Sequence, residues 1–100
     1  MLIVTGVIEV AAKDAEAMAV AARAMVAETV KEEGCHVYEF SQDVSAPGRF
    51  RVYEEWQDDA CLAAHGQAAH MVEFRAALGE IGVASRRVVK FVPGPISVLG

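Results

Sequence analysis

The stretch that decides the fold is residues 35–57, CHVYEFSQDVSAPGRFRVYEEWQ. Its two ends, 35–43 and 49–57, are rich in β-branched and aromatic residues, and the VSAPG between them is typical of a turn. The stretch therefore predicts two antiparallel strands joined by a short loop. Because side chains alternate along a strand, one face of the second strand carries Phe50, Val52, Glu54 and Trp56.

The residues that precede this hairpin predict a strand and then a helix. In residues 1–10, MLIVTGVIEV, both alternating sets of side chains are largely apolar, which indicates a strand covered on both faces. Residues 14–33 predict a long helix that Gly34 closes. The helix has a stripe at helical spacing, formed by Met18, Ala22, Met25 and Thr29.

The residues that follow the hairpin predict a second helical region and a fourth strand. Asp58 and Asp59 favour a helix start, and Gly66 divides the region into a short piece up to His65 and a longer piece from 67 to 78. Residues 85–92, SRRVVKFV, predict a strand. The apolar tail after it is interrupted by two prolines, so we expect it to lie across a surface rather than extend the sheet.

The predicted order is β-α-β-β-α-β over a single domain of residues 1–100. It indicates an α+β, ferredoxin-like fold with a four-stranded antiparallel sheet and both helices on one face. The strands carry apolar residues on both faces, but the chain has helices for only one. We therefore expect a homodimer in which a second copy covers the bare face and the tail Ile96–Leu99 reaches toward it.

The composition argues against several kinds of partner. The net charge is −5 and there is no basic stripe, so nucleic-acid binding is not expected. The apolar runs are too short to span a membrane, and the first residues lack the pattern of a signal peptide. These observations predict a cytoplasmic protein with no membrane partner.

The cysteines and the motifs indicate neither a metal nor a cofactor. Cys35 and Cys61 form no CxxC pair and are expected to be reduced and partly buried. Cys61 and His65 are four residues apart on a predicted helix, but two ligands without a second pair are a weak zinc signal. The sequence has no GxGxxG, no P-loop, and no cluster of carboxylates and histidines at metal spacing.

Glu54 and His65 are the two candidate catalytic residues. A carboxylate between Val52 and Trp56 on an apolar face needs a partner or a raised pKa. Glu54 is therefore either a structural ion-pair or helix-capping residue, or an acid, a base or a group that orients one. His65 is either a helix-terminal cation or a general base. The catalytic hypothesis expects the two side chains to approach one another across a cavity.

A longer set of residues carries a family resemblance. It comprises Gly34, Cys35, Tyr38, Phe40, Gln42, Asp43, Pro47, Phe50, the Glu54-x-Trp56 pair, Ala60, the His65-x4-His70 pair and Phe74. In this pattern and in its element order the chain resembles the antibiotic biosynthesis monooxygenase family, or quinol monooxygenases, of the dimeric α/β-barrel superfamily. The resemblance implies a cofactor-free monooxygenase that acts with molecular oxygen on a small aromatic phenol or hydroquinone, bound between helices and sheet.

Four further side chains are candidates for binding such a substrate: Trp56, His70, Tyr38 and Phe74. Each has a structural alternative. Trp56 suits a core anchor as well as a pocket wall, and Tyr38 suits the core or an interface. His70 follows His65 by five residues, about 140° around an unbroken helix, so the two histidines need not share a pocket. Arg86 and Arg87 point to opposite faces and suit solvated surface positions, although one could steady an anionic oxygen.

Two other functions remain open at this point. One is a non-oxidative isomerase or aldolase-like enzyme that processes a small carbonyl metabolite. The other is a non-catalytic dimer that binds a ligand, with Glu54 held in an ion pair. Haem degradation is disfavoured, because haem degraders that the chain resembles carry an Asn on the first strand, where this chain has Thr5 and Gly6.

Overall fold

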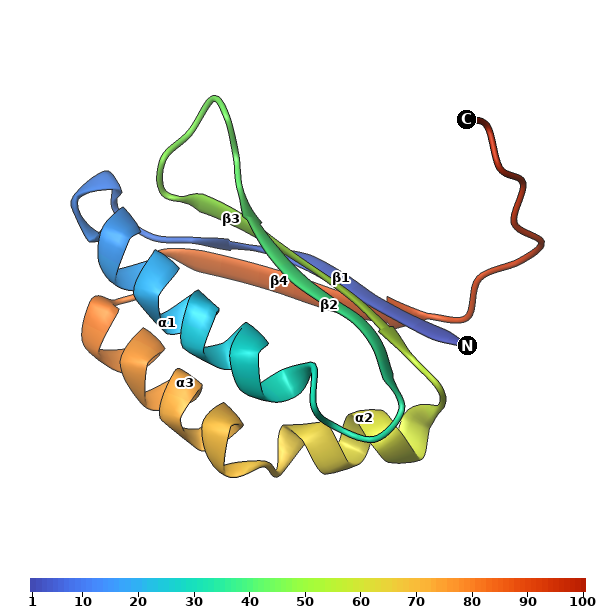
Figure 1. The fold of residues 1–100 in the computed structure, drawn as a ribbon. Helices are drawn as coiled ribbons and strands as arrows, with labels where there is room; N and C mark the ends of the chain where they lie inside the picture. Colours follow the sequence, from blue (N-terminus) through green and yellow to red (C-terminus); the bar gives the residue numbers. More distant parts are fainter.

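The computed structural model covers residues 1–100 and consists of one antiparallel sheet with all its helices on one face (Figure 1). In chain order the elements are β1 (Leu2–Glu9), the 3₁₀ turn η1 (Ala12–Asp14), α1 (Ala15–Thr29), β2 (Cys35–Gln42), β3 (Arg49–Trp56), α2 (Asp59–Gly66), α3 (Ala69–Ile81) and β4 (Ser85–Phe91). This confirms the predicted β-α-β-β-α-β order, including the division of the second helical region into two pieces.

The four strands lie in the order β2-β3-β1-β4. β1 is central and pairs antiparallel with both β3 and β4, while β2 pairs antiparallel with β3. This is the ferredoxin-like topology that the sequence predicted. The register places Val4 opposite Glu54 and Leu2 opposite Trp56, so the side chains of one β3 face meet the apolar face of β1.

The core lies between the sheet and the helices. Its β1 and β3 side chains come from the faces that alternation predicted, and α1 and α3 contribute their apolar stripes. Trp56 and Met18 have no exposed surface at all. The main members are Leu2, Val4, Ile8, Met18, Met25, Tyr38, Phe50, Val52, Trp56, Phe74 and Leu78.

α1 ends earlier than the sequence predicted, and the difference matters for the site. We expected a helix through residue 33, but α1 stops at Thr29 and residues 30–34 form turns. Gly34 has φ 77°, and a Cβ there would clash with Cys61 Sγ, so this position needs glycine. The early stop places Glu32 on a turn, from which its carboxylate reaches the residues at the α2–α3 junction.

The other face of the sheet is covered by no element of this chain (Figure 1). Cross-strand pairing aligns Ile3 with Phe91 and Thr5 with Val89 on this face. Arg51 and Glu55 of β3 add charges beside them. The bare face is therefore a mixed surface: its apolar side chains include Val89 and Phe91 of β4, and its charged ones include Arg87 of β4 as well as the β3 pair.

The C-terminal tail, residues 92–100, forms no strand, as expected, and leaves the body of the molecule (Figure 1). Its apolar side chains are exposed: Val98 by 86% and Leu99 by 99%. The tail thus does not pack on its own chain. None of the helices reaches the length and apolar character that crossing a lipid bilayer requires.

Candidate functional site

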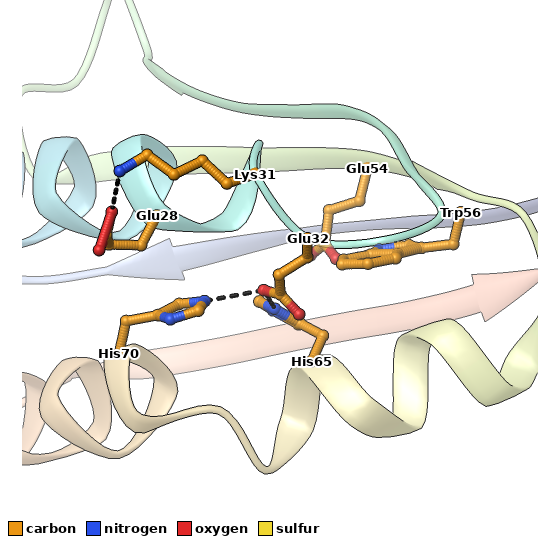
Figure 2. Close-up of polar contacts among 7 residues, drawn as sticks. All are labelled: Glu28, Lys31, Glu32, Glu54, Trp56, His65 and His70. Carbon is orange, nitrogen blue, oxygen red and sulfur yellow. Dashed lines mark hydrogen bonds and ion pairs between the residues drawn. The ribbon is translucent and has the colours of Figure 1, made fainter.

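Two polar groupings lie close together at one end of the helical layer (Figure 2). The first, the Glu54–Trp56 pair, lies on β3, where residues two apart share a face. The indole Nε1–H of Trp56 donates a hydrogen bond of 2.7 Å to Glu54 Oε1. Glu54 is only 5% exposed, and Trp56 is fully buried. The partner that a carboxylate at this position required is therefore an uncharged indole rather than an arginine or histidine.

This environment changes the acidity of Glu54. Burial raises the pKa of its carboxyl from 4.5 to about 7. The Trp56 N–H favours the charged form and partly opposes the effect, whereas the nearby charge of Glu32 raises the pKa further. Glu54 thus exchanges its proton near neutral pH, which is the property of a general acid or base.

The second grouping, the histidine cluster, consists of Glu32, His65 and His70. His65 Nδ1 and His70 Nε2 each lie 2.7 Å from the same carboxylate oxygen, Oε2 of Glu32. His65 lies on the last turn of α2 and His70 on the first turn of α3. The break between α2 and α3 turns both rings toward Glu32. On an unbroken helix the two rings would instead lie about 140° apart.

His65 connects the two groupings. Its imidazole is 3% exposed, and its ring centroid lies 4.9 Å from that of Trp56 and 5.4 Å from that of Tyr38. His65 is hydrogen-bonded to the carboxylate of Glu32, whereas the carboxyl of Glu54 accepts its hydrogen bond from Trp56. Glu54 and His65 therefore do not form the direct contact that was expected. The indole of Trp56 lies between them: it donates a hydrogen bond to Glu54 and packs against His65, which has Glu32 as its own carboxylate partner.

A cavity of about 530 Å³ lies between the sheet and α3. Three predicted site residues line it: Glu54, Tyr38 and Phe74. The other lining residues are mainly apolar, with arginines among them: Ile8, Phe40, Val52, Met71, Arg75, Leu78, Arg86, Arg87 and Val88. Trp56, His65 and His70 are not among the lining residues. Three of the predicted site residues thus form part of the cavity wall, and the other three lie in a layer behind that wall.

Tyr38 stands at the boundary between these two layers. Its side chain lines the cavity, and its ring also packs against His65. Burial raises the pKa of the Tyr38 hydroxyl, and the charges of Glu54, Cys35 and Glu32 raise it further. Tyr38 therefore stays protonated and can act only as a neutral hydrogen-bonding group toward a molecule in the cavity.

Sequence reasoning missed Glu32. It belongs to the run Lys31-Glu32-Glu33 at the predicted end of a helix, where charges are usually solvated. No spacing rule relates it to His65 or His70, more than thirty residues away. The sequence has no cluster of carboxylates and histidines at metal spacing, but the fold brings three such side chains together from distant positions. The ligating atoms of Glu32, His65 and His70 all lie within 4.8 Å of one another, and Cys61 is not among them.

Comparison with known proteins identifies the family. The sequence profile described as antibiotic biosynthesis monooxygenase matches residues 1–77. The chain belongs to this family. The resemblance inferred from the Glu54-x-Trp56 and His65-x4-His70 patterns is thereby confirmed, and so is a role within a monooxygenase family. No curated protein matches the chain significantly.

Solved structures of the antibiotic biosynthesis monooxygenase fold superimpose closely on this chain. One, from Deinococcus radiodurans and described as a proposed family member, shares 25% identity over 100% of both chains, with a TM-score of 0.92. A Pseudomonas aeruginosa protein shares 28% identity over 94% of each chain, with a TM-score of 0.87. A conserved Bacteroides thetaiotaomicron protein, described as a possible oxidoreductase, shares 27% identity over 90% of this chain and 94% of its own, with a TM-score of 0.82.

Proposed function

We propose that the protein is a cofactor-independent monooxygenase that acts on a small aromatic phenol or hydroquinone with molecular oxygen. Family membership supports the class of reaction. The observation that carries the proposal is a buried carboxyl, Glu54, in the wall of a largely apolar cavity, with a pKa raised to about 7. Such a group can take a proton from a phenol at neutral pH, and the apolar side chains around it remove part of its contact with water.

The proposed chemistry needs no electron carrier from the protein. Glu54 removes a proton from the phenol, and the resulting electron-rich anion passes one electron to oxygen. The two radicals combine to form a carbon–oxygen bond, giving a peroxide. When the peroxide O–O bond breaks, one oxygen atom stays on the substrate. The other leaves as water with two hydrogens from the substrate, which ends oxidised to a quinone.

Different side chains in and behind the cavity wall serve to bind the ring, to stabilise the anion and to position the base. Tyr38 and Phe74 offer aromatic surfaces against which a planar ring can pack. Arg75 and Arg86 add cationic groups that favour an anionic oxygen. His65 touches Tyr38 and Trp56 but not the cavity, so we propose it as a positioning residue that holds these rings and, through Trp56, the Glu54 carboxyl.

Oxygen consumption tests this function directly. Purified protein is mixed with a hydroquinone or an anthrone, with a chelator present and no metal or flavin added. We expect one oxygen molecule to be consumed for each substrate converted, and one oxygen atom from ¹⁸O₂ to appear in the product. Turnover of a small carbonyl metabolite without oxygen would instead indicate the isomerase or aldolase-like alternative. Saturable binding without turnover of any substrate would indicate a ligand-binding protein.

We also propose that the working form is a homodimer, with the bare face of the sheet against a second copy. The face that includes Ile3, Val7, Val89 and Phe91 is covered by no element of the chain, and the tail exposes Ile96, Val98 and Leu99. Burial of this surface should form a large contact of about 2,000 Å² or more in total. Sedimentation at micromolar concentration is expected to show twice the mass of one chain, 10.7 kDa. A single folded monomer at that concentration would exclude the proposal.

A further inference from the structure

We propose that Glu32, His65 and His70 form a binding site for a divalent metal ion of the zinc class. The three side chains bring two imidazole nitrogens and a carboxylate oxygen to within 4.8 Å of one another. They come from three different elements, the turn after α1, the end of α2 and the start of α3 (Figure 2). The proposal does not depend on the oxygenase function, because none of the three residues lines the cavity.

The ligand set suits zinc and its neighbours. Imidazole nitrogen and carboxylate oxygen are standard zinc ligands, and three protein ligands leave a fourth position for water. Zinc ligands lie about 2.0–2.2 Å from the metal, so tetrahedral neighbours stand about 3.3 Å apart. The present contacts of 2.7 Å from each histidine nitrogen to Glu32 Oε2 must therefore widen by a few tenths of an ångström. Rotation of the Glu32 side chain achieves this, since it lies on a turn outside the helix and is 17% exposed.

Both histidine rings already turn a nitrogen toward the Glu32 carboxylate. His65 is held by its packing against Trp56 and Tyr38, and its ring centroid lies 6.0 Å from that of His70. For coordination each imidazole must turn a lone pair, rather than an N–H, toward the ion. The proton then moves to the other ring nitrogen, so a neutral histidine can bind with no net loss of a proton.

A metal ion can reach the site from the His70 side. His70 is 19% exposed and borders a hollow of about 260 Å³ between α1 and α3. Glu28 borders the same hollow, where its carboxylate pairs with Lys31 Nζ at 2.8 Å (Figure 2). Lys31 neutralises the charge of Glu28, but Glu73 also borders the hollow, and Glu73 and Glu32 together make the approach favourable for a cation.

The test measures metal binding on its own, without an activity assay. The full chain is stripped with a chelator and titrated with Co²⁺, followed by visible absorption, and with Zn²⁺ in competition with a chromogenic chelator. We expect one ion per chain. Glu32→Gln and His70→Asn should each weaken binding by at least about 100-fold, since even loss of a group that only orients a ligand costs 10- to 100-fold. Matched controls remove a neighbouring carboxylate and an exposed histidine: Glu33→Gln and His36→Asn should bind as the parent does.

Two results with the variants would overturn the proposal. One is equal affinity in the parent and in the double variant Glu32→Gln/His70→Asn; the other is loss of binding in His36→Asn with retention in His70→Asn. Circular dichroism checks that each variant folds. X-ray absorption of the zinc-loaded parent needs no variant: two imidazoles in the first shell support the site, and a shell with no imidazole rejects it. Zinc should also raise the melting temperature of the parent but not that of Glu32→Gln.

Discussion

Glu54→Gln is expected to lower turnover of the phenolic substrate by about 10²–10⁴-fold, the usual contribution of a general base. The amide keeps the size of the carboxyl, and its oxygen can still accept the hydrogen bond from Trp56 Nε1. It cannot take a proton. Turnover of the parent should rise with pH through about 7, as Glu54 loses its proton, and this rise should disappear in the variant. The measurement is the pH profile of kcat/KM for both proteins.

Stability separates this catalytic role from a structural one. The folded-state pKa of Glu54 lies above the ordinary value of 4.5, so folding favours the protonated form. The resulting stabilisation is complete below about pH 4.5 and is lost as the pH rises through about 7, a change on the order of 3 kcal/mol. Glu54→Gln stays neutral, so at pH 8 we expect it to be at least as stable as the parent.

Glu80→Gln is the matched control for this prediction, because it removes the same charge from an exposed position on α3. It should change neither the pH profile nor the free energy of unfolding. A folded Glu54→Gln protein with the parent's turnover would exclude Glu54 as the base. A marked loss of stability with unchanged turnover per folded molecule would assign Glu54 a structural role.

Trp56→Ala is expected to cost about 3–5 kcal/mol of unfolding free energy, as truncation of a buried tryptophan usually does. The indole has no exposed surface, and it packs against His65 and donates to Glu54. The substitution therefore leaves a cavity and also removes the only hydrogen bond found for the Glu54 carboxyl. Small domains have a total stability of about 5–15 kcal/mol, so this variant should be close to unfolding at room temperature. Urea denaturation followed by circular dichroism measures the loss.

The variant Trp56→Phe separates the contribution of the buried volume from that of the hydrogen bond to Glu54. It keeps most of the buried volume but has no N–H, so it should cost less stability than alanine. The Trp56 N–H lowers the pKa of Glu54, and its loss should shift the rise in turnover to higher pH. A Trp56→Ala protein that melts with the parent would contradict the burial of this side chain and the assignment of the β3 faces.

The sequence alone predicted most of the fold, because alternation and helical spacing are local properties. The stretch 35–57 indicated both strands of the hairpin, and the pattern of Phe50, Val52 and Trp56 identified the face of β3 that is buried. Gly66 indicated where the second helical region divides. The end of α1 was harder to predict, since Val30 and Lys31 are compatible with a helix and only the turn at Gly34 requires the chain to leave it.

In the candidate site, too, the sequence predicted what depends on neighbouring residues and missed what depends on contacts between distant elements. Glu54 could be identified from sequence alone, because a carboxyl between two apolar neighbours on a buried face must be either paired or neutral. Its partner could not, since alternation places Trp56 on the same face but does not show whether the indole or a residue of another element makes the hydrogen bond. Glu32 acquires its importance only because α1 stops at Thr29 and the break between α2 and α3 turns His65 and His70 toward one carboxylate. Residue patterns determine which side chains face inward, but contacts between elements distant in sequence depend on how helices end and pack, which only the tertiary structure decides.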